Sequence, residues 1–314
     1  MRPIRIATRG SELALAQARY VASRIEAELK SETELVVIVT TGDQIQDRSL
    51  AKIGGKGLFI KEIEQSLLED RADLAVHSAK DLPAEMAPGL ELSAFPDRGD
   101  PRDALVGREK AQTLETLSQG ARVGTGSTRR AAQLLALRPD LEIVPLRGNV
   151  PTRLKKMETE DLEAVILASA GLDRLGLSDV ISQRIAPEIM LPAVCQGLLA
   201  LQTREGDALS EQISKLDDSQ NAVEAKAERA FLRQLGGDCT IPLAAHCEER
   251  GEGRIVIRAC LANSDGTTLI HSEVEGSRAD ALALGQRAAD DILDSGGRAL
   301  LRDLRAGMSG ETQP

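Results

Sequence analysis

Arginines recur in this sequence where a strand-like run gives way to a helix-like one. Arg9 stands between the apolar run 4–7 and a Gly-Ser pair, and Arg129 and Arg130 close the segment Gly124-Thr-Gly-Ser-Thr-Arg-Arg130. In a parallel α/β sheet, strand carboxyl ends and helix amino ends share the edge where ligands bind. Guanidinium groups pair there with carboxylates or phosphates. Each arginine alone is typical of a solvated surface or an ion pair, but together they predict a site for a small polyanion. The set comprises Arg9, Arg129, Arg130, Arg147, Arg153 and Arg174.

A second candidate lies in the segment Val76-His-Ser-Ala-Lys-Asp-Leu-Pro83, which follows a short apolar run. Lys80 and Asp81 are adjacent and would lie at the same edge of the sheet. An aspartate there can act as a general acid or base, or stabilise a developing positive charge. The alternative is an exposed Lys-Asp pair in a turn before proline, and spacing alone favours neither. We interpret His77 as structural.

The glycine-rich segment 51–59 carries Lys52 and Lys56 and leads into a helix-like run. It lacks the Gly-x4-Gly-Lys-Ser/Thr spacing of a Walker A loop and the Gly-x-Gly-x-x-Gly spacing of a dinucleotide site. A mobile lid over a cleft fits it better than a nucleotide site, and a plain flexible loop is the alternative.

Two of the four cysteines could be reactive. Cys239 follows Gly236-Gly237 at the end of a helix-like run, so we expect it on an accessible loop, where a thiol can act as a nucleophile or an attachment point. Cys195, in Pro192-Ala-Val-Cys-Gln-Gly197, is the alternative, and the chemistry leaves both open. Cys247 and Cys260 lie in apolar contexts typical of core residues.

Composition narrows the classes of function. The chain has 314 residues, a formal net charge of −10, no Trp, one Tyr and three Phe. The acidic charge and the small number of aromatic side chains make nucleic-acid binding an unfavoured function. Three histidines are also few for a zinc site built on histidine ligands. No run approaches the roughly 20 apolar residues of a membrane span, and the amino-terminal residues lack the apolar core of a secretory signal. We therefore expect a cytoplasmic protein that binds no metal, nucleic acid or membrane.

The elements that must position these residues alternate between strands and helices. Apolar runs at 4–7 and 34–40 and a short run at 73–76 predict strands of a parallel sheet, buried on both faces, and the periodicity between them predicts helices. A second block predicts strands at 103–107, 121–125, 141–146 and 163–168 and helices at 127–137, 150–159 and 169–176. A third block predicts a helix from about 219, strands at 254–261 and 267–275, and one last long helix after Ser277. Taken as consecutive blocks, these predict two similar α/β lobes with a cleft between them, followed by a smaller unit.

Several segments, taken in order, resemble the porphobilinogen deaminase (hydroxymethylbilane synthase) family over about residues 4–247. They are Ile6-Ala-Thr-Arg-Gly-Ser11, Gly54-Gly-Lys-Gly-Leu-Phe59, His77-Ser-Ala-Lys-Asp-Leu-Pro83, Asp100-Pro-Arg-Asp-Ala104, Gly124-Thr-Gly-Ser-Thr-Arg-Arg130, Leu146-Arg-Gly-Asn149, Leu191-Pro-Ala-Val-Cys-Gln-Gly197 and the loop ending in Cys239.

The resemblance implies an α/β fold with two lobes like those of periplasmic binding proteins, a central cleft, and a smaller α+β C-terminal domain that carries the cofactor cysteine. It also implies that the chain crosses between the lobes twice. The implied domains are 1–99 with 193–217, 100–192, and 218–314.

The resemblance further implies a monomeric transferase of tetrapyrrole (porphyrin) biosynthesis. Four porphobilinogen molecules would be joined head to tail with loss of ammonia, and water would release the linear tetrapyrrole hydroxymethylbilane. The primer would be a dipyrromethane cofactor, attached through a thioether to Cys239.

The residues match the family's site position by position. Asp81 matches the catalytic aspartate, which faces pyrrole N–H groups and stabilises the positive intermediate formed as ammonia leaves. Lys52, Lys56 and Phe59 match the mobile loop. The matches to substrate-binding and catalytic residues are Arg9, Lys80, Arg147, Arg153, Arg174 and Gln196. The matches to cofactor contacts are Ser78, Lys80, Asp81, Thr125, Ser127, Arg129, Arg130 and Arg147.

The chain departs from the family pattern at four positions, Gly126, Thr128, Cys195 and Asp238. A rival function is a receptor that holds an organic polyanion without turnover, which would have no use for the Cys239 loop. A nucleotide-binding enzyme is a weaker third reading.

Overall fold

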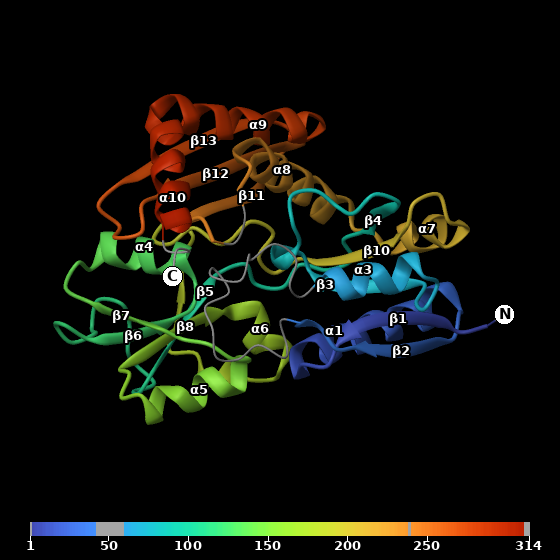
Figure 1. Ribbon diagram of the computed structural model, residues 1–314, viewed down its shortest axis with the longest axis horizontal. Helices are drawn as coiled ribbons and strands as arrows, with labels where there is room; N and C mark the ends of the chain where they lie inside the picture. Colours follow the sequence, from blue (N-terminus) through green and yellow to red (C-terminus); the bar gives the residue numbers. More distant parts are fainter. Residues whose placement is uncertain (1, 42–59, 238–239, 311–314) are drawn as a thin grey trace.

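The computed structural model describes residues 2–41, 60–237 and 240–310 and forms three units, each built on its own sheet (Figure 1). Two five-stranded sheets make a first and a second lobe, and a three-stranded sheet makes the C-terminal domain. In the view of Figure 1, the C-terminal domain lies above both lobes.

The first lobe has the strand order β2-β1-β3-β10-β4. Strands β1, β2 and β3 run parallel, as predicted, whereas β10 is antiparallel to both β3 and β4. Side chains alternate between two cores: Ile4 and Ile6 pack with α1, and Ala7 packs with α3 on the other face. The strands are β1 (Ile4–Arg9), β2 (Thr33–Ile38), β3 (Leu74–Ser78), β4 (Leu90–Ala94) and β10 (Leu199–Arg204). The helices are α1 (Glu12–Arg24), α3 (Lys61–Leu68) and α7 (Ala208–Ile213), with a 3-10 turn at Ala79–Asp81.

The second lobe repeats this plan in the order β7-β6-β8-β5-β9. Strands β6, β7 and β8 are parallel, and β5 is antiparallel to β8 and β9. Helix α4 packs on one face, while α5 and α6 pack on the other. The strands are β5 (Asp103–Gly107), β6 (Arg122–Thr125), β7 (Glu142–Pro145), β8 (Ala164–Ala168) and β9 (Gln183–Ile185). The helices are α4 (Thr128–Leu137), α5 (Val150–Thr159) and α6 (Ser169–Arg174).

The C-terminal domain is an antiparallel sheet, β11-β12-β13, covered by helices. Phe231 of α8 is fully buried in this core. Helices α8 and α9 cross so closely that a Cβ on Gly285 would lie 2.0 Å from the Ala227 carbonyl oxygen, so only glycine fits there. The elements are α8 (Ser219–Leu235), β11 (Leu243–Gly251), β12 (Arg254–Ala262), β13 (Leu269–Ser277), α9 (Ala281–Ile292) and α10 (Arg298–Gly310).

Three expectations drawn from the residue pattern are wrong. The three blocks are not consecutive, because β10 returns to the first sheet after the whole second sheet has formed. The run 34–40 is not buried on both faces, because β2 is an edge strand and Val37 and Val39 are exposed. The last helix is not continuous: Gly296 has a φ of 106°, which only glycine adopts freely, and the chain kinks there between α9 and α10.

Candidate active site

The sheet edges place the predicted residues where the two lobes meet. In the first lobe, β3 ends at Ser78 and the turn Ala79–Asp81 follows directly. In the second lobe, β6 ends at Thr125, and Ser127 caps α4 by accepting a hydrogen bond from the Arg130 backbone N–H. This cap satisfies an N–H that the helix start leaves unpaired, and it fixes the helix start beside the strand end.

Arg129 and Arg130 are buried together on the first turn of α4, and both contact the carboxylate of Asp103. Arg129 Nη1 lies 2.8 Å from Asp103 Oδ2, and Arg130 Nε lies 2.8 Å from Oδ1. Burial alone would raise the pKa of Asp103, but the two guanidinium charges hold that pKa well below its usual range. Arg129 Nε is buried with no hydrogen-bond partner among the described residues.

Gln196 connects this pair to the first lobe. It is fully buried on the second crossing between the lobes. Its Nε2 donates to Asp103 Oδ1 (2.9 Å) and to the Pro101 carbonyl (2.7 Å), and its Oε1 accepts from Lys80 Nζ (3.3 Å) and Arg130 Nη2 (3.4 Å). One amide therefore holds cationic groups from both lobes.

Burial, with repulsion from Arg130, lowers the pKa of Lys80 to about 8. Arg153 on α5 is affected in the same way: burial and the charge of Arg130 lower its pKa to about 10. In both cases burial is the larger cause, and the repulsion from Arg130 adds to it; a bound polyanion would relieve that repulsion.

Asp81 is exposed and lies near enough to oppose these pKa shifts in Lys80 and Arg153. Arg147 lies near Arg153, adds to its positive surroundings, and makes no hydrogen bond or ion pair within the described part of the chain. Arg153 Nε donates to the Gly148 carbonyl oxygen at 2.8 Å, which fixes its stem to the loop that carries Arg147.

The remaining polar positions lie at the same strand ends. Arg9 is the last residue of β1 and is half-buried. Ser78 Oγ and the Gln17 side chain form hydrogen bonds of 2.9 and 3.2 Å. Thr125 is buried, and its Oγ1 accepts from the Ser127 backbone N–H. His77 is buried against Gln202, and burial lowers its pKa to about 4, as suits a structural histidine.

Arg174 lies beside the crossings. Its Nη2 donates to Asp97 Oδ2 and to the Gly197 carbonyl oxygen, each at 2.7 Å. Gly197 has a φ of 88°, and a Cβ there would lie 2.3 Å from the Gly99 carbonyl oxygen, so at this point the two crossings meet backbone to backbone. This guanidinium thus has one nitrogen engaged by the crossing, and only its others could reach a ligand.

The three cysteines that the structure describes are unsuited to act as nucleophiles or as attachment points. Cys195, Cys247 and Cys260 are all buried, and burial raises each pKa, so these thiols remain protonated and inaccessible. Cys195 has a φ of 58°, a left-handed conformation that glycine adopts more readily than a residue with a side chain. This excludes the Cys195 alternative and leaves Cys239 as the candidate thiol. Cys239 lies outside the described residues, as do Asp238, Lys52, Lys56 and Phe59.

Two departures from the family pattern have a structural reason. A Cβ on Gly126 would lie 2.4 Å from the Leu146 carbonyl oxygen, so no side chain fits. Thr128 Oγ1 donates to the Thr240 carbonyl oxygen at 3.2 Å. This bond joins the start of α4 to the residue that follows Cys239.

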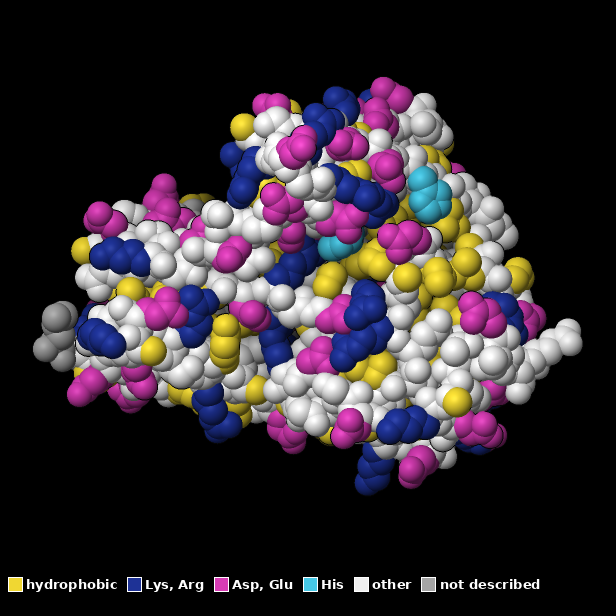
Figure 2. Space-filling view, turned by 180° about the vertical axis from the view of Figure 1, so that it is seen from behind, with side chains coloured by type: hydrophobic (Ala, Val, Ile, Leu, Met, Phe, Trp, Pro, Cys, Tyr) yellow, Lys and Arg dark blue, Asp and Glu magenta, His cyan; other side chains and the backbone are white. Residues whose placement is uncertain are grey.

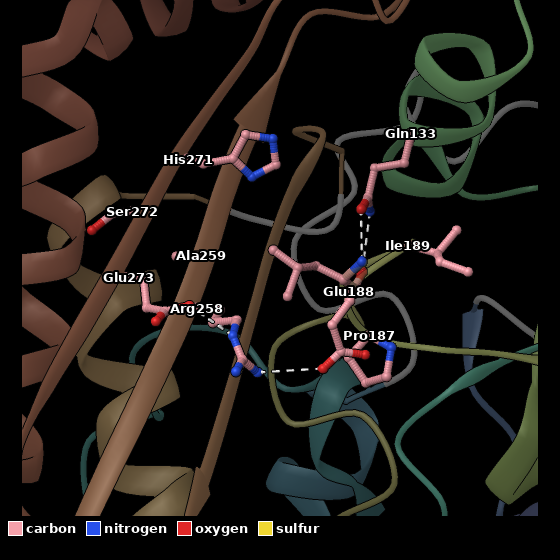
Figure 3. Close-up of a pocket in the computed structure, with 10 residues that line it drawn as sticks. Gln133, Pro187, Glu188, Ile189, Arg258, Ala259, His271, Ser272 and Glu273 are labelled. Carbon is pink, nitrogen blue, oxygen red and sulfur yellow. Dashed lines mark hydrogen bonds and ion pairs between the residues drawn. The ribbon is translucent and has the colours of Figure 1, made fainter.

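A pocket lies elsewhere, at the seam between the second lobe and the C-terminal domain (Figure 3). In Figure 2, hydrophobic side chains gather between these two units, and acidic and basic groups are interspersed around them. Among the described residues that line the pocket, Arg258 is the one arginine, and it contacts Glu273 at 2.8 Å, Glu248 at 3.0 Å and Glu188 at 3.8 Å. With its arginine neutralised by carboxylates, this pocket does not suit a polyanion.

Asp103 is the site residue that sequence reasoning missed. A lone carboxylate opening the apolar run Asp103-Ala-Leu-Val-Gly107 was the available signal, since a buried charge requires a partner. Within the described residues, the structure holds no group of three or more His, Cys, Asp or Glu side chains arranged to hold a metal ion. In the same residues, no helix is long and apolar enough to cross a membrane.

Comparison with known proteins finds one family along nearly the whole chain. Residues 4–212 match the model described as porphobilinogen deaminase, dipyromethane cofactor binding domain, and residues 222–294 match that of the C-terminal domain. A porphobilinogen deaminase of Syntrophus aciditrophicus is 49% identical over 97% of this chain and 100% of the relative. One from Trichlorobacter lovleyi is 45% identical over 96% of each. Among solved structures, a periplasmic substrate-binding protein from Coxiella burnetii matches with a TM-score of 0.44 and 13% identity, covering 72% of this chain and 96% of that one.

Proposed function

The chain belongs to the porphobilinogen deaminase family, and from that premise we propose how its own residues divide the reaction. It is a transferase that joins four porphobilinogen units head to tail on a dipyrromethane cofactor, releases ammonia at each addition, and finally releases hydroxymethylbilane by hydrolysis. The roles assigned below to single residues are inferred from their contacts and charges.

The residues present fit the cofactor, whose pyrroles carry acetate and propionate groups. Five cations, Lys80, Arg129, Arg130, Arg147 and Arg153, gather around two carboxylates, Asp81 and Asp103. Arg129 Nε has no hydrogen-bond partner within the part of the chain that the structure describes, and we assign this buried donor to a carboxylate of the cofactor. We assign cofactor binding to Ser78, Lys80, Asp81, Thr125, Ser127, Arg129, Arg130 and Arg147, with Cys239 as the anchor. When bound, the cofactor supplies the free pyrrole position to which the first substrate is joined.

Asp81 is the proposed catalytic residue. It is the exposed carboxylate of the cluster, whereas the carboxylate of Asp103 is fully buried and already paired with Arg129 and Arg130. A carboxylate so placed can accept pyrrole N–H bonds and stabilise the positive charge that develops on the substrate as ammonia leaves. It can also take a proton from the ring carbon or give one to the departing amine.

The arginines farther from Asp103 bind the acidic side chains of the substrate and of the growing chain. Arg9, at the end of β1, and Arg153, on α5, lie on opposite lobes. Arg174 and Gln196 act from the crossings, where Gln196 orients Lys80 and Arg130. Their placement on two lobes suits a ligand that lengthens by successive additions.

The excess of cations around one exposed aspartate is the observation that carries this assignment. The direct test incubates the purified protein with porphobilinogen and measures ammonia and linear tetrapyrrole together. We expect four ammonia molecules for each tetrapyrrole. Binding of porphobilinogen without ammonia would instead favour a receptor for a polyanion.

The domain division 1–99 with 193–217, 100–192 and 218–314 is part of the proposal. It is supported by sheet membership, since β10 belongs to the first sheet, β5–β9 to the second, and β11–β13 to the third. Limited proteolysis should cut near these boundaries, and cuts within the sheets would contradict the division.

We also propose that the protein acts as a monomer in the cytoplasm, with no nucleic-acid, membrane or metal partner. Reduced cysteines support the compartment, because three thiols are free and buried. Light scattering on the purified protein should give a single mass near 33.6 kDa, and twice that mass would refute the monomer.

A further inference from the structure

We propose that Asp103 is the positioning residue of this site: its buried carboxylate sets the orientation of Arg129, Arg130 and Gln196, and through Gln196 that of Lys80. The inference rests on the proposed function, because it concerns the side chains assigned there to the cofactor and the substrate.

The carboxylate lies at the centre of the cluster. Asp103 is the first residue of β5, a strand flanked on both sides by β8 and β9, and it has no exposed surface. Oδ2 accepts from Arg129 Nη1 at 2.8 Å. Oδ1 accepts from Arg130 Nε at 2.8 Å, Gln196 Nε2 at 2.9 Å and Arg129 Nη2 at 3.2 Å. Two oxygens therefore fix three side chains from α4 and from the crossing.

The contacts of Asp103 leave the arginines little freedom. Apart from the Arg130 contact with Gln196, their remaining bonds are to backbone carbonyls, from Arg129 Nη1 to Leu191 (2.6 Å) and from Arg130 Nη1 to Ile166 (3.2 Å). A planar guanidinium held at two edges has one orientation. Each arginine is thus set in place before any ligand arrives, which is what a site for successive additions to one primer requires.

The chain of contacts reaches the other lobe through a single amide. Gln196 receives its orientation from Asp103 and Pro101, because its Nε2 donates to both. This turns Oε1 toward Lys80 Nζ and Arg130 Nη2. Lys80 immediately precedes Asp81, so Asp103 connects the arginine pair to the residue beside the catalytic aspartate.

Asp103 also acts on Lys80 through charge. The charged groups facing Lys80 are Asp81 beside it in the chain, Arg129 and Arg130 on α4, and Asp103 on β5. The arginines lower the pKa of Lys80 and the aspartates raise it. Removing the Asp103 charge should therefore lower the Lys80 pKa further, which supplies a readout that requires no turnover.

A purely structural ion pair is the competing explanation, and Asp73 provides a matched control. Asp73 is buried, precedes β3 at the opposite end of the first sheet, and accepts hydrogen bonds from Arg2 and Arg5 at 2.8–3.0 Å. Both Asp103→Asn and Asp73→Asn remove a buried charge paired with two arginines. Only Asp103 contacts the site.

The test compares these variants with the parent, all produced in cells that make no porphobilinogen. Acetylation of Lys80 is followed by peptide mass spectrometry across pH, and porphobilinogen is then added to follow cofactor loading by intact mass. We expect Asp103→Asn to move the midpoint of Lys80 acetylation to lower pH and to slow loading at least about tenfold. Asp73→Asn should match the parent in both.

Each outcome of this comparison supports or refutes the positioning role of Asp103. An unchanged Lys80 midpoint in folded Asp103→Asn, or equal loading in the two variants, overturns the proposal. If Asp103→Asn does not fold, Asp103→Glu keeps the charge but displaces it by one methylene. Slow loading with a midpoint near the parent's then supports the positioning role, and normal loading refutes it. A parent that acetylates as expected but never loads would contradict the proposed function instead.

Discussion

Replacement of Gly266 by alanine tests how the C-terminal domain holds α4, the helix that carries Arg129 and Arg130. Gly266 lies in the turn between β12 and β13 and packs on the α4 backbone. A Cβ there would lie 2.3 Å from the Ala132 carbonyl oxygen and 2.7 Å from the Ala136 nitrogen. Neither atom is on a flexible side chain, so the turn or the helix must move.

The expected loss in the free energy of unfolding of Gly266→Ala has two parts. The φ of Gly266 is 73°, and a non-glycine residue in that region costs about 1–2 kcal/mol. Overpacking against backbone adds about 1–3 kcal/mol. The matched control is Gly253→Ala in the neighbouring hairpin, where φ is 69° and nothing lies within 4 Å of an added Cβ. Gly253→Ala therefore has the cost of a positive φ without the cost of overpacking.

The assay measures urea unfolding and cofactor loading for both variants. We expect Gly266→Ala to lose about 1–3 kcal/mol more than Gly253→Ala. We also expect it to load the cofactor about tenfold or more slowly, because a displaced α4 moves Arg129 and Arg130 relative to Asp103. Equal stability and equal loading in the two variants would refute the claim that this contact sets the position of α4.

Three further predictions concern the charged cluster. Asp81→Ala should almost abolish turnover while the free energy of unfolding stays within about 0.5 kcal/mol of the parent, because Asp81 is exposed; a destabilised or fully active variant would contradict its role. Arg130→Leu should lower the free energy of unfolding by about 3–5 kcal/mol and also impair cofactor loading, because it leaves the buried Asp103 short of a partner. Arg147→Leu should impair loading with little change in urea unfolding, and equal stabilities of the two variants would contradict this difference. The pKa of Lys80 is about 8 in the folded protein and 10.5 ordinarily, so cofactor loading should weaken as pH rises through 8 and Lys80 loses its charge. Over the same range, from pH 8 to 10.5, the free energy of unfolding should rise, because the unfolded chain binds one more proton than the folded chain. Lys80→Arg should show neither trend, and a trend that persists in this variant belongs to another group.

The sequence predicts local elements well where periodicity and caps agree. The strand at 103–107 and the helix at 150–159 coincide with β5 and α5, and in the structure the Asn149 side chain caps α5 by accepting from the Thr152 backbone N–H. Hydrophobic pattern indicates that a segment is a strand, but it does not say which sheet the strand joins. The return of β10 to the first sheet therefore escaped the residue pattern.

The site was only partly predictable for a similar reason. Arginines at strand ends identify the polyanion site, because fold geometry gathers them at one edge. Their partner Asp103 precedes them by 26 and 27 residues, and only the sheet brings it beneath α4. Cys195 and Cys239 each lie two residues from a glycine, so the local sequence does not rank them. The burial of Cys195, which the local sequence does not encode, is what marks that thiol as inert.

The central claim is that this chain carries a primer of two linked pyrroles on Cys239. The most direct measurement is the intact mass of the purified protein beside a Cys239→Ser variant. The account predicts extra mass equal to two linked pyrroles in the parent and none in the variant. A parent that carries no such mass and gains none with added porphobilinogen, or a variant that still carries it, would contradict the account.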